Sequence, residues 1–134
     1  MPEEEKGKIL IIDDEDGIRA VLKAILESID IQTLEASNAR SALEVLEENK
    51  QSIAGCLLDM NLEDSYGEDL YDKLRTTSPD LTVFAMSGIF GAEIRERLGE
   101  RVISGFIAKP FTASDIIQTV QAGLEKRTSS EEQN

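Results

Sequence analysis

The sequence predicts an α/β fold, a (βα)5 arrangement in which five parallel strands form one doubly wound sheet. The alternation of two apolar patterns supports this class. Short, continuous apolar runs alternate with segments whose apolar residues recur at helical spacing, and the alternation occurs five times along the 134 residues. A strand, a helix and a second strand form a right-handed crossover, so neighbouring strands are parallel and helices cover both faces of the sheet.

The predicted strands are short runs of residues that are rich in apolar side chains. In chain order they are KILII (8–12), IQTLEA (31–36), IAGCLLD (53–59), LTVFAMS (81–87) and VISGFIA (102–108). The first and third runs have no polar alternation, which is typical of strands that are buried on both faces. The second alternates between polar and apolar residues, as a strand with one exposed face does.

The predicted helices follow these strands, and each has local signals for its start or end. Ser37 or Asn38 provides an N-cap for the second helix, and Thr112 or Ser114 provides one for the last. Pro79 ends the third helix, because the residue before a proline disfavours helical geometry. The helices are expected at 15 to about 28, across Ala39 to Leu46, at 67–76, at 91–100 and at 112–126.

Composition excludes several kinds of function. The net charge of −13 argues against nonspecific binding to nucleic acid, whose affinity comes largely from Lys and Arg on phosphates. The chain has no histidine, which rules out imidazole metal ligands and every nucleophile that needs a histidine base. Any chemistry therefore depends on carboxylates, hydroxyls and lysines.

The length and the ends of the chain indicate one domain. Residues 8–126 form this predicted domain, between polar, flexible ends at 1–7 and 127–134. The second of these ends would serve as a tail or as the start of a linker. No stretch of the sequence approaches a run of about 18 apolar residues, which a membrane span needs. The charged N-terminus does not resemble a secretory signal. We therefore expect no membrane association and a cytoplasmic location.

Charged and polar residues follow four of the five predicted strands. Asp13 and Asp14 follow the first, Asp59 ends the third, Ser87 ends the fourth and Lys109 follows the fifth. Ligands of open parallel sheets bind outside the carboxyl ends of the strands, so these side chains should converge. Three carboxylates suit a hard cation such as Mg²⁺, and Asp59 can act as a nucleophile toward a phosphoryl group.

The order of these residues resembles a known family, the receiver domain of two-component response regulators (the CheY-like superfamily). The resemblance covers residues 7–126. It depends on Asp13-Asp14, on LLDMNLEDSYG around Asp59, on Ser87-Gly88 after the fourth strand, and on KPF at 109–111. It implies a flavodoxin-like strand order, 2-1-3-4-5.

The resemblance also implies how a metal and a phosphoryl group would bind. Asp59 would be the phosphoacceptor. Asp14 and Asp59 would ligate Mg²⁺ through their carboxylates and Asn61 through its backbone carbonyl, whereas Asp13 would act through water. Mn²⁺ would substitute for Mg²⁺.

Further roles are implied for residues near the fourth and fifth strands. Lys109 would pair with the phosphoryl oxygens, and Ser87 would follow the phosphoryl group as the switch hydroxyl. Phe106 would be the switch aromatic, which changes rotamer when Ser87 moves. The peptide bond between Lys109 and Pro110 would be cis.

The leading functional interpretation is a signalling switch that catalyses its own phosphorylation and dephosphorylation and is not a turnover enzyme. A sensor histidine kinase or a phosphotransfer protein would donate the phosphoryl group. The output would be a partner protein or a domain outside this chain, with no direct nucleic-acid contact. The expected output face, and a homodimer interface, is the fourth helix, fifth strand and fifth helix, where Ile94, Leu98 and Phe106 would provide apolar contact points.

The sequence departs from the family pattern at three places. Glu63 stands where the family often has proline, although Gly67 retains the loop glycine. Position 106 is Phe and not Tyr. Ile89 is apolar where relatives often carry polar groups that orient the hydrolytic water, so we expect slow loss of the phosphoryl group.

Three alternatives remain open. An aspartate-nucleophile phosphohydrolase is one, but Asn61 stands where its acid/base aspartate is usual. A flavin-binding electron carrier is another, although DDEDG (13–17) would repel phosphate. The third is a receiver-like docking module that is never phosphorylated.

Overall fold

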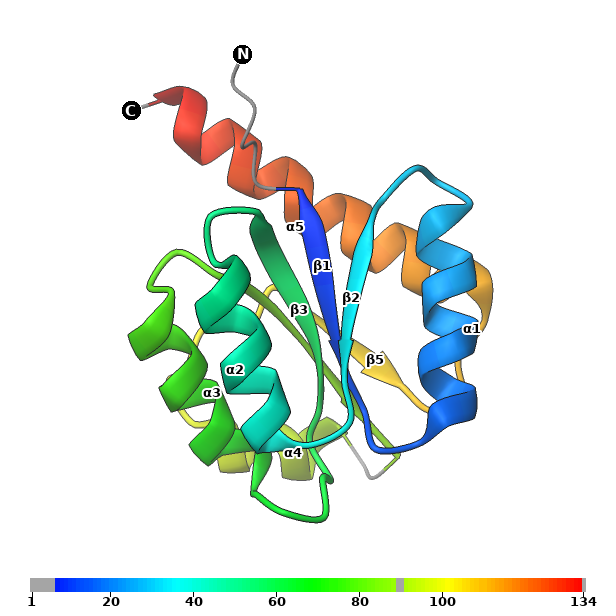
Figure 1. The fold of residues 1–134 in the computed structure, drawn as a ribbon, viewed down its shortest axis with the longest axis vertical. Helices are drawn as coiled ribbons and strands as arrows, with labels where there is room; N and C mark the ends of the chain where they lie inside the picture. The colour runs from blue at the N-terminus through cyan, green and yellow to red at the C-terminus, as the bar shows by residue number, and fades with distance from the viewer. Residues whose placement is uncertain (1–6, 89–90, 134) are drawn as a thin grey trace.

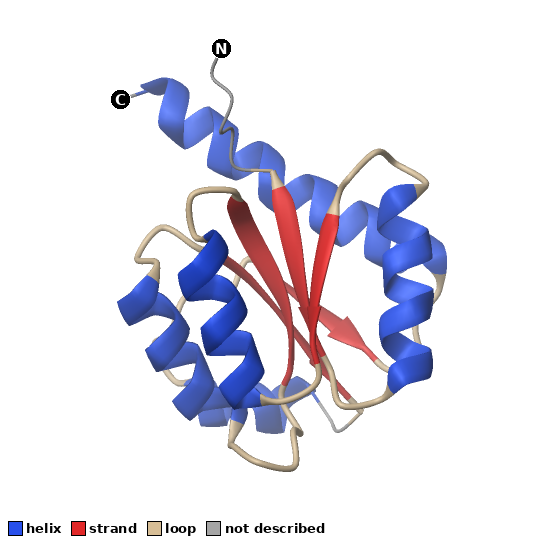
Figure 2. Cartoon of the chain, in the orientation of Figure 1, coloured by secondary structure: helices blue, strands red, loops and turns tan. Residues whose placement is uncertain are grey.

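The computed structural model describes residues 7–88 and 91–133, which form one five-stranded parallel sheet flanked by helices (Figures 1 and 2). The strand order is β2-β1-β3-β4-β5, as predicted. The strands are β1 (Lys8–Ile12), β2 (Thr33–Ala36), β3 (Ile53–Asp59), β4 (Thr82–Ser87) and β5 (Gly105–Ala108). The helices are α1 (Asp16–Glu27), α2 (Ala39–Asn49), α3 (Gly67–Thr77), α4 (Gly91–Leu98) and α5 (Ala113–Gln133).

The helices form two layers, one on each face of the sheet. The apolar residues of α1 and α5 pack against one face, around the buried side chain of Phe84. Those of α2, α3 and α4 pack against the other face, around Leu10 and Leu58. Every residue of β3 is buried, because this central strand is covered on both sides. The continuous apolar pattern of β3 is thus explained by its position.

Two helix N-caps could be selected only with the structure. Asn38 caps α2, since its side chain accepts a hydrogen bond from the backbone N–H of Ser41 at 2.8 Å. Thr112 caps α5 in a reciprocal pair with Asp115: the Thr112 hydroxyl accepts from the Asp115 N–H at 3.0 Å. The Asp115 carboxylate accepts from the Thr112 N–H at 2.9 Å.

Two strands begin clearly later than expected. β2 begins at Thr33 and not at 31, and β5 begins at Gly105 and not at 102. The Tyr71 hydroxyl donates to the Val102 carbonyl at 2.8 Å and accepts from the Val102 N–H at 2.9 Å, so a side chain occupies backbone groups that a longer strand would use.

The end of the chain is also more regular than expected. The helix α5 continues to Gln133, seven residues past the expected domain end at 126, because no glycine or proline interrupts it after Gly123. Residues 127–133 are therefore helical where a loose tail was expected. Flexible ends were also expected at residues 1–6 and at residue 134, which lie outside the described residues. None of the described helices is both long enough and apolar enough to cross a membrane.

The prediction that Ile94 and Leu98 are apolar contact points on the output face is wrong. Their exposed fractions are 0% and 2%, and both belong to the core under α4. The short α4 has only a narrow apolar stripe, and it packs that stripe against the sheet. Phe106 is half-buried against the same core, so part of it remains accessible.

The register of the sheet brings the polar strand ends to one edge. The paired residues are Ile12 with Leu58, Asp59 with Met86, and Ser87 with Ala108. The residues at or just after these pairs therefore meet at the carboxyl edge, where the chain leaves β1, β3, β4 and β5.

Candidate metal centre

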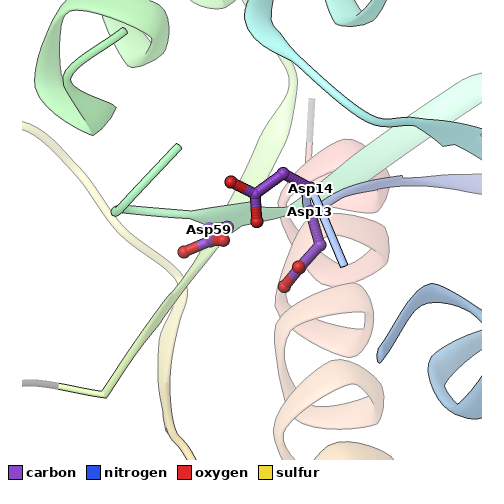
Figure 3. Close-up of side chains that lie close together, drawn as sticks. All are labelled: Asp13, Asp14 and Asp59. Atoms are coloured by element: carbon purple, nitrogen blue, oxygen red, sulfur yellow. The ribbon is translucent and has the colours of Figure 1, made fainter. Parts of the chain in front are cut away.

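Three carboxylates meet at the carboxyl edge of the sheet (Figure 3). Asp13 and Asp14 follow β1, and Asp59 is the last residue of β3. Each offers one oxygen, and these oxygens all lie within 4.8 Å of one another. Asp13 is fully buried and Asp59 is 3% exposed, whereas Asp14 is partly open to solvent. The structure thus brings together the three acids that the sequence predicted.

Lys109 supplies a positive charge inside this cluster. Its Nζ lies 2.8 Å from Asp13 Oδ2 and 3.5 Å from Asp59 Oδ2. The lysine is held there by the backbone, since its N–H donates to the Ser87 carbonyl at 2.9 Å. The peptide bond that follows, between Lys109 and Pro110, is cis. Lys109 pairs most closely with Asp13, which leaves Asp59 only partly neutralised.

Hydrogen bonds distinguish the three acids. Both oxygens of Asp13 are occupied, because Oδ1 accepts from the Glu15 N–H at 2.9 Å and Oδ2 accepts from Lys109. Asp59 Oδ1 accepts from the Asn61 N–H at 2.9 Å. Among the described residues, no hydrogen bond reaches the Asp14 carboxylate. Asp14 and one oxygen of Asp59 therefore retain more capacity to ligate a cation than Asp13 does.

The pKa values of the cluster reflect the crowding of its charges. Burial raises the pKa of Asp59 above its ordinary value. The Asn61 N–H and Lys109 act in the opposite direction, and the charges of Asp13 and Asp14 add to the increase. Burial lowers the pKa of Lys109, but its hydrogen bond to Asp13 and its attraction to Asp59 outweigh this effect, so the pKa is raised. The lysine is therefore firmly protonated.

Ser87 and Asn61 lie next to the carboxylates. Ser87 is buried at the end of β4, and its hydroxyl accepts a hydrogen bond of 3.4 Å from the Asn61 side-chain amide. Asn61 is the second residue after Asp59. Its side chain therefore connects the turn that follows Asp59 to Ser87. The predicted residues of β3, β4 and the loop after β5 therefore occupy a single site.

Phe106 lies outside this cluster. It is on β5, paired with Ala85, and the guanidinium of Arg95 on α4 stands over its ring at 4.7 Å from the centroid. Phe106 has no hydroxyl for a hydrogen bond, and its ring makes a cation–π contact with Arg95. Ile89, to which slow dephosphorylation was attributed, lies outside the described residues.

Two arginines that contact the site were not recognised from the sequence. Arg19 donates to the Asp13 carbonyl at 2.7 Å and also pairs with Asp16. The three-residue spacing of Asp16 and Arg19 on a helix was an available signal. Arg97 of α4 lies 2.7 Å from Glu68 and 3.5 Å from the carbonyl of Met60, next to Asp59. No local pattern indicates that contact.

The donor set defines the kind of ligand that fits. Three carboxylates and one ammonium group leave a formal excess of two negative charges, which a divalent cation would balance. All donors are oxygens, and the chain has no histidine and a single, buried cysteine. Such a set favours hard cations such as Mg²⁺, Ca²⁺ or Mn²⁺ over zinc.

The fold is that of a doubly wound α/β domain with an acidic site at the carboxyl ends of its strands. Comparisons with known proteins identify the family to which this domain belongs. Residues 9–121 match the response regulator receiver domain family. The transcriptional regulatory protein SrrA of Staphylococcus aureus is 37% identical over 125 residues, covering 92% of this chain and 50% of SrrA. The sensor kinase CckA of Brucella abortus is 29% identical over 119 residues, covering 89% of this chain and 13% of CckA.

A solved structure agrees. A response regulator receiver domain protein from Clostridium thermocellum superposes with a TM-score of 0.80 at 28% identity, covering 91% of this chain and 98% of that one. The chain belongs to the response regulator receiver domain family, whose members are signalling modules and not classical enzymes. It spans half the length of SrrA and a smaller part of CckA.

We predict that Asp59→Asn stabilises the metal-free protein at pH 7. Because burial raises the pKa of Asp59 above the ordinary value of an aspartate, the native state binds more protons than the unfolded state between the two pKa values. Stability therefore falls as pH rises through that window. The amide should increase the free energy of unfolding by about 0.5–2 kcal/mol, the range typical of single stabilising substitutions.

Urea unfolding in the presence of a chelator measures this difference. The gain should shrink when the pH is lowered until Asp59 is protonated. Equal or lower stability of the variant at pH 7 would show that the buried charge of Asp59 does not destabilise the folded protein.

Proposed function

We propose that the chain is a phosphorylation switch in which Asp59 accepts a phosphoryl group with the help of Mg²⁺. The observation that carries the proposal is the cluster of Asp13, Asp14 and Asp59 oxygens within 4.8 Å, with Lys109 bound at its edge. The family supports the general role, and these side chains supply the chemistry.

The metal would be held by Asp14 and Asp59 through their carboxylates and by Asn61 through its backbone carbonyl. Asp13 would act through water, in keeping with the occupation of both its oxygens by Glu15 and Lys109. When bound, Mg²⁺ neutralises charge on phosphoryl oxygens and so lets an anion approach a carboxylate. Mn²⁺ has similar oxygen preference and would substitute.

The phosphoryl donor would be a phosphohistidine of a sensor kinase or a phosphotransfer protein. A carboxylate oxygen of Asp59 attacks phosphorus, the phosphorus–nitrogen bond breaks, and its electron pair returns to the imidazole of the donor. Lys109 then pairs with the phosphoryl oxygens, and the Ser87 hydroxyl donates a hydrogen bond to one of them. The product is an acyl phosphate on Asp59, which water later cleaves.

The output would follow from the change of charge at Asp59, where a phosphoryl group with a charge of about −1.5 to −2 would replace the single negative charge of the carboxylate. Movement of Ser87 toward the phosphoryl group would free space for Phe106 to change rotamer, which would alter the surface of α4, β5 and α5. Arg95 over Phe106 and the exposed Val102 lie in this region. A downstream protein, an output domain outside the chain, or a second copy would recognise the change, in the cytoplasm and without direct contact to nucleic acid.

The structure gives less support to the alternatives. A phosphohydrolase of this kind needs a second acid beside its nucleophile, and the amide of Asn61, which contacts Ser87, cannot donate a proton in that role. A docking module without phosphorylation would have no need for a buried Asp59 with an ion-paired lysine. The phosphohydrolase and the docking module are both outcomes of the following experiment.

We predict that incubation with Mg²⁺ and acetyl phosphate adds one phosphoryl group to the chain, detected by intact-mass spectrometry. Asp59→Asn should show no addition, because the amide is a far weaker nucleophile than the carboxylate. Asp69→Asn, which removes an exposed acid of α3, is the matched control and should react like the wild type. Magnesium-dependent phosphatase turnover without a trapped adduct would favour the hydrolase, and no reaction at all would favour the docking module.

We also predict that the phosphorylated chain loses its phosphoryl group slowly, since Ile89 offers no hydrogen bond to an attacking water. The time course after removal of acetyl phosphate measures this loss. Ile89→Asn should shorten the lifetime without reducing the extent of phosphorylation. A lifetime of only seconds in the unsubstituted chain would contradict the prediction.

A further inference from the structure

Asp64 links the loop after Asp59 to a helix that is distant in sequence. It lies near the tip of the loop between β3 and α3 (residues 60–66). Its Oδ1 and Oδ2 accept from the backbone N–H of Ala39, the first residue of α2, at 2.9 and 3.1 Å. The two residues are 25 positions apart in the sequence.

The N-terminus of α2 suits this contact. The first amides of a helix have no partner within the helix, and that end carries a partial positive charge. Asn38 satisfies the amide of Ser41, but the first turn of α2 contains no acidic residue. Asp64 thus supplies to Ala39 both the missing acceptor and the missing negative charge.

The base of the same loop is fixed by other contacts. The Met60 N–H donates to the Met86 carbonyl at 2.9 Å, and an isolated bridge pairs Asn61 with Tyr66. Leu62 is buried. The tip of the loop consists of residues 63–65. Among the described residues, the Ala39 N–H is the only hydrogen-bond partner of this tip in another helix or strand, and it donates to Asp64.

No proline stiffens the backbone of residues 63–65, so the sequence of the tip does not restrain it. Position 63 is Glu, which leaves the φ angle free to vary, and its side chain is exposed. The tip is two residues from Asn61, whose backbone carbonyl is a ligand under the proposed function. A displacement of the tip would therefore move a metal ligand.

We infer that Asp64 is a positioning residue of the metal centre, which holds the loop that carries Asn61 against the N-terminus of α2. The inference rests on the proposed function, because only there does the Asn61 carbonyl bind the cation. Magnesium requires near-ideal octahedral distances of about 2.0–2.1 Å, so a carbonyl on a displaced loop binds it poorly. Asp64 touches neither the metal nor the phosphoryl group.

A purely structural role makes a different prediction. If Asp64 only caps α2, its loss lowers stability and leaves the affinity for Mg²⁺ unchanged. If it positions the loop, its loss weakens Mg²⁺ binding in a chain that is still folded. Two variants separate the positional effect from the effect of charge: Asp64→Asn retains an oxygen acceptor, and Glu63→Ala removes an equal charge from the neighbouring residue.

The experiment is titration of the metal-free full chain with Mg²⁺ by calorimetry. Asp64→Ala should bind Mg²⁺ about tenfold more weakly, the lower end of the effect of removing a partner that orients a metal ligand. Asp64→Asn and Glu63→Ala should bind nearly as tightly as the wild type. At saturating Mg²⁺, Asp64→Ala should recover the wild-type rate of phosphorylation by acetyl phosphate, because the defect is in binding.

Ala39→Pro tests the same contact from the other side. It removes the N–H that Asp64 accepts, and proline is well tolerated at the first residue of a helix. Asn38 is already in the extended conformation that a following proline requires. Ala39→Pro should weaken Mg²⁺ binding as much as Asp64→Ala, and the double variant should lose no more. This keeps the test decisive even if Asp64→Ala does not fold.

The outcomes separate the inference from the proposed function. If the wild type binds Mg²⁺ and is phosphorylated while Asp64→Ala or Ala39→Pro binds as tightly as the wild type, the inference is overturned and the proposed function stands. Equal weakening by Glu63→Ala would also overturn it, since charge alone would then explain the effect. If the wild type binds no Mg²⁺, the proposed function fails and the inference fails with it.

Discussion

The ion pairs of Lys109 with Asp13 and Asp59 are the interactions on which the site depends. Three carboxylates within 4.8 Å of one another repel, and two of them are almost fully buried. The lysine, at 2.8 Å from one acid and 3.5 Å from another, offsets part of this repulsion. Burial, with a smaller contribution from the remaining repulsion by Asp13 and Asp14, raises the pKa of Asp59. The folded chain thus retains an unbalanced negative charge at this site. Binding of a cation or of a proton would neutralise it.

The loop after Asp59 connects this charge to the rest of the fold. It contacts α2 through Asp64 and α4 through Arg97, whose guanidinium lies near the Met60 carbonyl. Two helices on one face of the sheet therefore contact this loop within a few residues of the acid, α2 at the Asp64 side chain and α4 at the Met60 carbonyl. On the other side of α4, Arg95 stands over the ring of Phe106. Helix α4 consequently contacts both the site and the surface that we propose carries the output.

Much of this arrangement could be predicted from the sequence, because it depends on regular elements. The apolar runs fix where the strands end, and parallel pairing then brings Asp13, Asp59 and Lys109 to one edge. The apolar spacing of α4 indicated which face of the helix is apolar but not what covers it, so Ile94 was wrongly placed on the surface. The contact of Asp64 with α2 could not be predicted, since its partner is a backbone amide 25 residues away that carries no sequence signal.

Anomalous diffraction from crystals of the full chain grown with Mn²⁺ is the most direct test of the central claim, that these acids form one cation site. We expect a single strong peak in contact with Asp14, Asp59 and the Asn61 carbonyl, with Lys109 still bound to Asp13. A peak elsewhere, or side chains of Asp14 and Asp59 that point into different surroundings with Lys109 distant from both, would contradict the claim.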